Sequence, residues 1–266
     1  RSGNELRVES RTQNLYTKTM EDNIFLCAIS DNGTLAVVTD DVSSMAKLQV
    51  YSPSMEQVLS WSMTANDGTP LRMAFSPDSR RVAAASVTAS GGQMQTNLYV
   101  VTLAQGEPVN VGSQSGVPQW VGWLSSTTLM AVYDNRAILY NASGGERASY
   151  DFSGKTLRGV SKDNAGNVAL LLASGQVCEL VTMDKNLSVQ YNGIVTTANQ
   201  VVRAGNVVYL LTDNTVECMT AAGEFQWSQS LSARPQALLA DAKQTLVFCG
   251  NTVQQVTPPS DADSAG

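Results

Sequence analysis

The sequence predicts an all-β protein, a β-propeller of four-stranded antiparallel blades, from three observations. Apolar residues make up 43% of the chain and charged residues only 15%, which is enough for a large buried core. Short apolar runs rich in Val, Ala, Leu and Thr alternate with Gly-bearing turns, as in a protein of many short strands. The runs recur with a period of about 36 to 48 residues, which is the length of one propeller blade.

Each repeat begins with a hairpin whose turn is easy to recognise. In the stretch AFSPDSRRVAAAS, residues 74–86, Pro77 and Asp78 separate two apolar runs. Proline presets φ for a turn, and short polar side chains satisfy turn backbone groups. The following run 82–85 is continuously apolar, as expected for a strand buried on both faces. A second hairpin follows, as in KLQVYSPSMEQVLSW, residues 47–61, so each repeat predicts four strands.

The strand count limits the number of blades. The pattern predicts two strands between residues 3 and 20, then five sets of four, then three strands between 235 and 257. Six blades close if residues 14–20 complete the final blade, whereas seven blades need three further strands upstream of Arg1. We favour seven blades, with the first blade and the closure incomplete in this chain, because that closure leaves no open sheet edge. We expect residues 1–257 to form a single propeller domain and 258–266 to be a disordered polar tail.

Composition also disfavours several functions. The net charge of −6 argues against nucleic acid as a partner, and no apolar run approaches the roughly 20 residues that cross a bilayer. The chain has no histidine, so it lacks the commonest general base and the commonest metal ligand. We therefore expect no enzyme, no metal site and no cofactor. The four cysteines fall inside predicted strands, where we expect buried free thiols: Cys27, Cys178, Cys218 and Cys249.

The longest connections suggest a binding face. They are expected at residues 41–46, 64–70, 88–95 and 112–118, and all four belong to loop classes that emerge on the same face of a propeller. The candidate recognition residues near this face are Arg72, Met94 and Trp120. Trp and Arg are over-represented in binding hot spots, but a Trp is more often simply packed. Trp120 and Trp123 should point to opposite faces of their strand, one against the loops and one between blades.

Several motifs resemble known propellers. SPDSRRVAAAS, residues 76–86, is similar to an inner-strand turn of WD40-like and TolB-like propellers. AAGEFQW, residues 221–227, resembles the outer hairpin of quinoprotein-type propellers, whose Trp docks against the next blade. Trp61 fits the same position, and Tyr150 and Tyr191 stand in corresponding outer strands.

A closer resemblance covers nearly the whole chain. The order of ISDNGTLAVVTD (residues 29–40), KLQVYSPSMEQVLSW and the later Gly-bearing hairpins is similar to an uncharacterised family, a domain of unknown function, from Gram-positive, often gut-dwelling anaerobes. Members of that family typically begin with a membrane-spanning helix followed by an extracytoplasmic propeller. The resemblance therefore implies an extracytoplasmic domain tethered to the membrane by an anchor upstream of Arg1.

The leading functional interpretation is a non-catalytic binding or scaffold propeller that recognises a protein or a cell-envelope component through its loop-rich face. Two alternatives stay open from the sequence. One is an extracytoplasmic enzyme acting on carbohydrate, and the other is a purely structural assembly module. The sequence makes no prediction of the oligomeric state.

Overall fold

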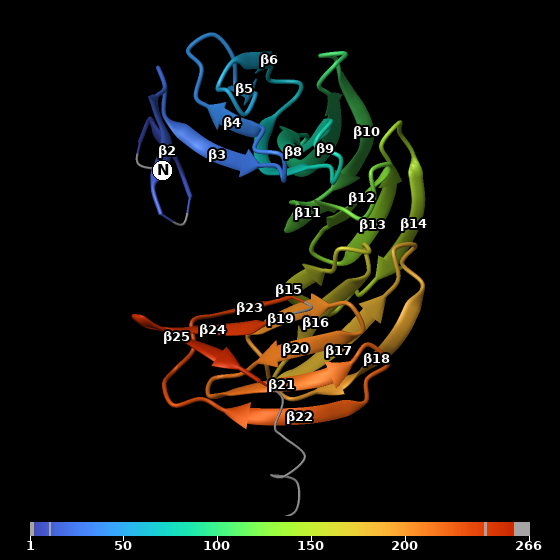
Figure 1. Cartoon of the computed structure of the whole chain (residues 1–266). Helices are drawn as coiled ribbons and strands as arrows, with labels where there is room; N and C mark the ends of the chain where they lie inside the picture. The colour runs from blue at the N-terminus through green and yellow to red at the C-terminus, as the bar shows by residue number, and fades with distance from the viewer. Residues whose placement is uncertain (1–2, 11, 242–243, 258–266) are drawn as a thin grey trace, which may run out of the picture. The chain divides into compact units, whose positions relative to one another are not determined.

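The computed structural model describes residues 3–10, 12–241 and 244–257, which form seven antiparallel sheets (Figure 1). These residues contain 25 strands and no helix, so none of them belongs to a helix able to span a membrane. The sheets contain two, then five times four, then three strands, which confirms the predicted count. Seven sheets also fit the favoured number of seven blades. The polar tail predicted at 258–266 lies outside the described residues.

The chain divides into two compact units, Arg1–Arg147 and Ala148–Gly266, each of which is described by itself. The first unit begins with a two-stranded sheet and continues with three four-stranded sheets, the last strand of which runs into the second unit. The strands of the two-stranded sheet are β1 (Glu5–Glu9) and β2 (Asn14–Thr19). The strands of the other sheets are β3 (Ile24–Ile29), β4 (Leu35–Thr39), β5 (Ala46–Tyr51) and β6 (Gln57–Met63); β7 (Thr69–Phe75), β8 (Arg81–Ser90), β9 (Gln93–Thr102) and β10 (Pro108–Ser115); and β11 (Trp120–Trp123), β12 (Thr128–Val132), β13 (Arg136–Asn141) and β14 (Glu146–Asp151).

The second unit contains two four-stranded sheets and a three-stranded sheet. Its strands are β15 (Thr156–Lys162), β16 (Val168–Ser174), β17 (Val177–Met183) and β18 (Val189–Val195); β19 (Gln200–Ala204), β20 (Val207–Leu211), β21 (Thr215–Thr220) and β22 (Phe225–Ser230); and β23 (Ala237–Ala240), β24 (Thr245–Cys249) and β25 (Thr252–Val256). In both units the strands of a sheet follow one another in sequence order, as hairpins predict.

The second strand of a sheet lies deepest in the core. Every residue of β4 and β12 is buried, and so is the run Val82–Ala85 of β8, which confirms the expectation of a strand covered on both faces. The three alanines of this run are fully buried, and their small side chains let neighbouring sheets approach closely. The apolar clusters join residues of successive sheets, so the core lies between the sheets.

The outermost strands dock on the next sheet through aromatic side chains. Trp61 of β6 meets Tyr99 of β9 edge-on, with 5.1 Å between ring centroids. Trp227 of β22 lies 6.0 Å from Tyr209 of its own sheet, between ring centroids, and packs against an apolar cluster of residues from β20, β21 and β23–β25. The docking that the resemblance implied is therefore confirmed for Trp61. Tyr191 of β18 lies over Gly223, where an added Cβ would be 2.0 Å from the ring. Glycine is therefore required at 223, both for this contact and for its φ of +87°.

The structure corrects two expectations about loops and one about a cysteine. The connection expected at 88–95 is a two-stranded extension in which β8 and β9 stay paired as far as Ser90 and Gln93. Likewise β10 continues to Ser115, so the connection expected at 112–118 occupies only 116–119. Cys27 is exposed on the innermost strand β3, whereas the other three cysteines are buried; all four are free thiols.

Candidate binding face

Four connections of the first unit lie at the same end of their sheets, because the strands alternate in direction. They join β4 to β5, β6 to β7, β8 to β9 and β10 to β11, and we call them the rim: residues 40–45, 64–68, 91–92 and 116–119. Hydrogen bonds link the rim to its supporting strands. The amide of Met45 donates to the carbonyl of Met63 at 2.8 Å, and the Ser86 hydroxyl donates to the carbonyl of Asp67.

The connection at 40–45 is held by its own side chains. The Asp41 carboxylate accepts hydrogen bonds from the hydroxyls of Ser44 and Ser43, and the Ser44 hydroxyl also donates to the carbonyl of Ala46. These bonds, first of all that from Ser44, lower the pKa of Asp41. Between them stands Val42, which is 100% exposed. The sequence did not predict this exposed side chain, which serves as a position for probing the rim.

Arg72 and Trp120 stand in the neighbouring innermost strands β7 and β11, and Arg72 reaches the residue that precedes Trp120. A bulge between Pro70 and Arg72 in β7 sets the direction of the exposed Arg72 side chain. Its Nε donates to the carbonyl of Gln119 at 2.9 Å, directly before Trp120. The Gln119 side-chain amide donates in turn to Asp134 at 2.6 Å. These polar groups form one connected patch on the rim.

Trp120 lies flat on its own strand. An added Cβ at Gly122 would be 2.2 Å from Cη2 of the Trp120 ring, so one ring face covers that glycine and the side chain is half-buried. Trp123 is buried on the opposite face, and its indole Nε1 donates to the carbonyl of Ala74 at 3.0 Å. The expected division of the two tryptophans is therefore confirmed, and Trp120 is the one placed at the rim.

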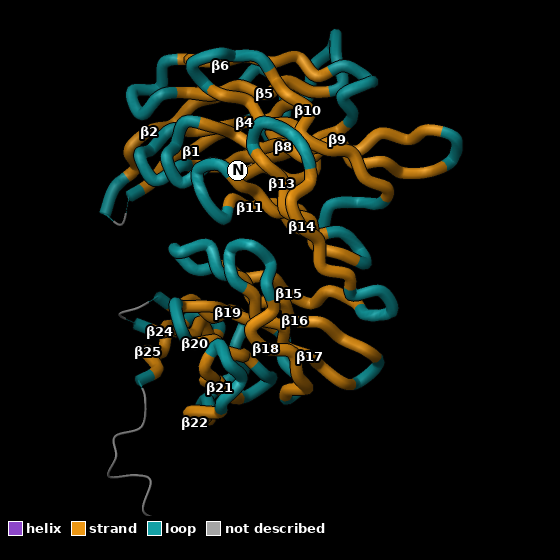
Figure 2. Tube along the Cα trace, turned by 90° about the vertical axis from the view of Figure 1, so that its right-hand side faces the viewer, coloured by secondary structure: helices purple, strands orange, loops and turns teal. Residues whose placement is uncertain are grey.

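Met94 belongs to the paired extension of β8 and β9, which projects beyond its sheet (Figure 2). Its side chain is 53% exposed, and its carbonyl accepts a hydrogen bond from the amide of Gly116 at 3.0 Å. Met94 thus meets the 116–119 connection at one end, while Arg72 and Trp120 meet it at the other. The three predicted residues are joined through this one segment.

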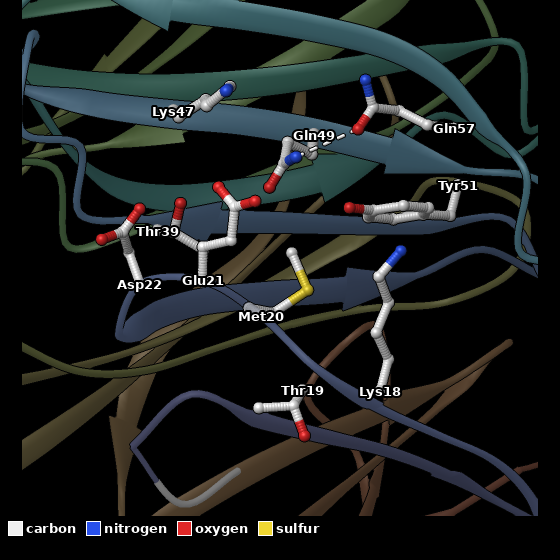
Figure 3. Close-up of a pocket in the computed structure, with 10 residues that line it drawn as sticks. All are labelled: Lys18, Thr19, Met20, Glu21, Asp22, Thr39, Lys47, Gln49, Tyr51 and Gln57. Atoms are coloured by element: carbon white, nitrogen blue, oxygen red, sulfur yellow. Dashed lines mark hydrogen bonds between the residues drawn. The ribbon is translucent and has the colours of Figure 1, made fainter.

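A hollow of about 350 Å³ lies on the same unit, where β2 and the residues after it face β4, β5 and β6 (Figure 3). Its lining is mainly polar, and one end is marked by Lys18, whose Nζ lies 4.2 Å from the centroid of the Tyr51 ring. The sequence did not predict this hollow. One feature of the sequence points to it. In β5, Lys47 and Gln49 alternate with the buried residues Leu48 and Val50, so one face of the strand is polar.

The second unit holds a buried ion pair that is structural. Arg203 and Asp163 are 4% and 6% exposed, and Nε of Arg203 lies 3.7 Å from Oδ2 of Asp163. Burial lowers the pKa of Arg203, but its guanidinium is bound by the carbonyls of Val168 and Met183 and by Gln190. With its donors used in this way, Arg203 fastens one sheet to the next.

Metal binding and thiol catalysis each need a particular arrangement of side chains. No group of three or more His, Cys, Asp or Glu side chains among them is placed to hold a metal ion. Burial raises the pKa of Cys218 to about 11, which keeps its thiol protonated and unreactive at neutral pH.

Comparison with known proteins places the chain in a family. The family of unknown function DUF5711 matches residues 1–257. The chain belongs to this family. A search of the curated proteins found no match.

Several solved structures share the fold of this DUF5711 member at low sequence identity. BamB from Moraxella catarrhalis has 11% identity and a TM-score of 0.59, and the match covers 96% of this chain and 84% of that chain. The Dos1 propeller has 14% identity and a TM-score of 0.53, with 89% and 71% covered. Sqt1 of Chaetomium thermophilum, solved bound to the N-terminus of ribosomal protein L10, has 11% identity and a TM-score of 0.56, with 91% and 74% covered. Together with the seven sheets, these matches show that the fold is a β-propeller.

Proposed function

We propose that the chain is a non-catalytic binding or scaffold propeller that recognises a protein or a cell-envelope component through the rim. The observation that carries the proposal is the rim itself, where ordered connections present exposed apolar side chains beside a patch of polar ones. Val42 is 100% exposed and Met94 is 53% exposed, while Arg72 is hydrogen-bonded to the carbonyl of the residue before Trp120. Trp and Arg are residue types that are enriched in binding hot spots.

A related observation supports a protein as the partner. The propeller of Sqt1 was solved with a segment of another protein bound to it. A propeller scaffold is therefore suited to hold a peptide segment, and the connections on a rigid scaffold are where recognition is usually placed. A non-catalytic role agrees with the lack of histidine in the chain.

We also propose that residues 1–257 form a single propeller domain held outside the cell membrane. The match of one family over residues 1–257 supports the single domain. The resemblance to propeller proteins that begin with a membrane-spanning helix supports the location. Separation of native cells into membrane and soluble fractions, with the intact mass of the protein, tests it.

The rim is tested by photo-crosslinking in intact cells with a light-activated amino acid in place of Val42. We expect a discrete cross-linked partner, and we expect Trp120→Ala and Arg72→Ala to reduce its yield at least tenfold, since a hot-spot residue contributes more than about 1.4 kcal/mol. The same amino acid in place of Phe225, which is 60% exposed in the second unit, is the control for a sticky apolar surface. Equal capture from both positions, or capture unchanged by the two alanine variants, would contradict the proposal.

A further inference from the structure

The face of the β3–β6 sheet turned toward β1 and β2 is apolar around Leu6, Val37 and Tyr51, but it becomes polar at the hollow. In β5, Leu48 and Val50 face the next sheet and belong to its apolar cluster. Lys47 and Gln49 alternate with them and face the hollow instead (Figure 3). In the corresponding strand β13, the residues turned toward the preceding sheet are the apolar Ile138 and Tyr140. Local rules are usually broken where a protein has a functional site.

The charged side chains of the hollow lack salt-bridge partners, although Lys18 lies over the Tyr51 ring. Lys18 and Lys47 line it together with Glu21 and Asp22, and none of the four forms an ion pair with another described residue. The two positive and two negative charges cancel. A charged ligand would disturb this balance, whereas a neutral ligand with many hydrogen-bonding groups keeps it.

Thr39 gives a second, independent indication. Its side chain is 2% exposed and lines the hollow, yet its hydroxyl has no hydrogen-bond partner among the described residues. Among the described residues only Arg136 Nε is a buried side-chain atom without a partner, so the Thr39 hydroxyl is open to the hollow. An incoming polar group can therefore pair with it directly. Gln49 and Gln57 are already tied to each other by a hydrogen bond of 3.0 Å, which fixes their amides and leaves one oxygen and one nitrogen for a ligand.

We infer that this hollow binds a neutral sugar. A sugar hydroxyl both donates and accepts, so it can bridge a carboxylate such as Asp22 and an ammonium such as Lys47. Met20 and Tyr51 also line the hollow, but at 6% and 2% exposed they present only their edges to it, so its hydrogen-bonding groups would make most of the contacts. The volume of about 350 Å³ lies at the lower end of the range for small-molecule sites, which suits one or two sugar units. The hollow lies beside the 40–45 connection but contains no residue of the rim, so the inference does not rest on the proposed function.

Saturation-transfer NMR on the whole chain, with a panel of neutral mono- and disaccharides, tests the inference. We expect transfer to at least one sugar, and we expect Gln49→Leu to weaken that binding at least fivefold. Gln229→Leu, on the outer strand β22, is the matched control and should leave the binding unchanged. If Gln49→Leu does not fold, Asp22→Asn takes its place, because it keeps the shape and removes one charge.

Three results would overturn the inference. The first is no transfer to any sugar of the panel. The second is transfer that persists unchanged in both Gln49→Leu and Asp22→Asn, which would place the sugar elsewhere. The third is a preference for glucuronic acid or glucosamine over the matching neutral sugar, which would contradict the argument from balanced charge.

Discussion

Replacement of Arg203 by methionine should destabilise the protein strongly. The guanidinium donates to the carbonyls of Val168 and Met183 at 2.8 and 3.0 Å and to Gln190 at 2.8 Å, in a place where Arg203 is 4% exposed. A hydrogen bond from a charged group contributes about 1.5–3 kcal/mol, and breaking a buried ion pair costs about 3–5 kcal/mol. These effects overlap, so we expect Arg203→Met to lower the free energy of unfolding by about 4 kcal/mol.

Urea unfolding followed by tryptophan fluorescence measures this loss. Arg158→Met is the matched control, because Arg158 is exposed on β15 and should change the free energy by less than about 0.5 kcal/mol. Arg203→Lys should lose most of the same free energy, since an ammonium cannot reproduce the planar fork that reaches several acceptors. A loss below about 1 kcal/mol for Arg203→Met would refute the view that this side chain fastens two sheets together.

Three other perturbations follow from the structure. At pH 8 a maleimide should modify Cys27 rapidly and the three buried thiols only after unfolding, as peptide mass spectrometry would show. Gly223→Ala should lower the urea midpoint more than Gly175→Ala, because both positions have positive φ but only at 223 does a Cβ meet the ring of Tyr191. The pKa of Asp184 lies below its ordinary 3.8, since hydrogen bonds from backbone amides outweigh the burial that raises it. Its contribution to stability is therefore present above pH 3.8 and lost as the pH falls below it, so Asp184→Asn should flatten the acid side of a stability–pH curve.

Each of these predictions has a contrary result. Equal labelling of all four cysteines in the folded protein would mean that the strands holding the buried thiols open readily. Equal midpoints for the two alanine variants would mean that Tyr191 moves aside without cost. An acid curve that is the same with and without the Asp184 carboxylate would mean that its hydrogen bonds persist in the unfolded chain.

The sequence predicted the order and number of strands because this information is local. At residues 76–79 the turn forms as its composition indicates, with the Ser76 hydroxyl donating to Asp78 and with Ser79 in the left-handed region at φ 57°. Apolar alternation then fixes which side of each strand is buried. The location of the rim also followed, because strand direction alone decides where the connections emerge.

Other features depended on contacts between sheets, which periodicity does not encode. The extension of β8 and β9 buries little, so its residues looked like a loop although their backbones stay paired. Cys27 sits in an apolar strand, but that strand is the innermost of its sheet and leaves the thiol exposed. The burial of Arg203 depends on acceptors 13 to 35 residues away in the chain. In β5 the alternation of Lys47 and Gln49 with apolar residues was visible, but it reads equally well as a solvated strand face.

The docking of aromatic side chains from one sheet to the next has a consequence for how this fold comes apart. Trp61 packs against Tyr99 of the next sheet, and Tyr191 packs on Gly223. Trp227 packs against a cluster that includes residues of β23–β25. A sheet with such a contact is stabilised in part by its neighbour, as in a linear array of repeats with nearest-neighbour coupling. In such an array a weakened sheet exposes the aromatic anchor of the sheet before it, so opening spreads toward the N-terminus. Within each unit, hydrogen exchange should therefore show protection that changes from sheet to sheet, and destabilising the last sheet of a unit should affect more sheets than destabilising its first.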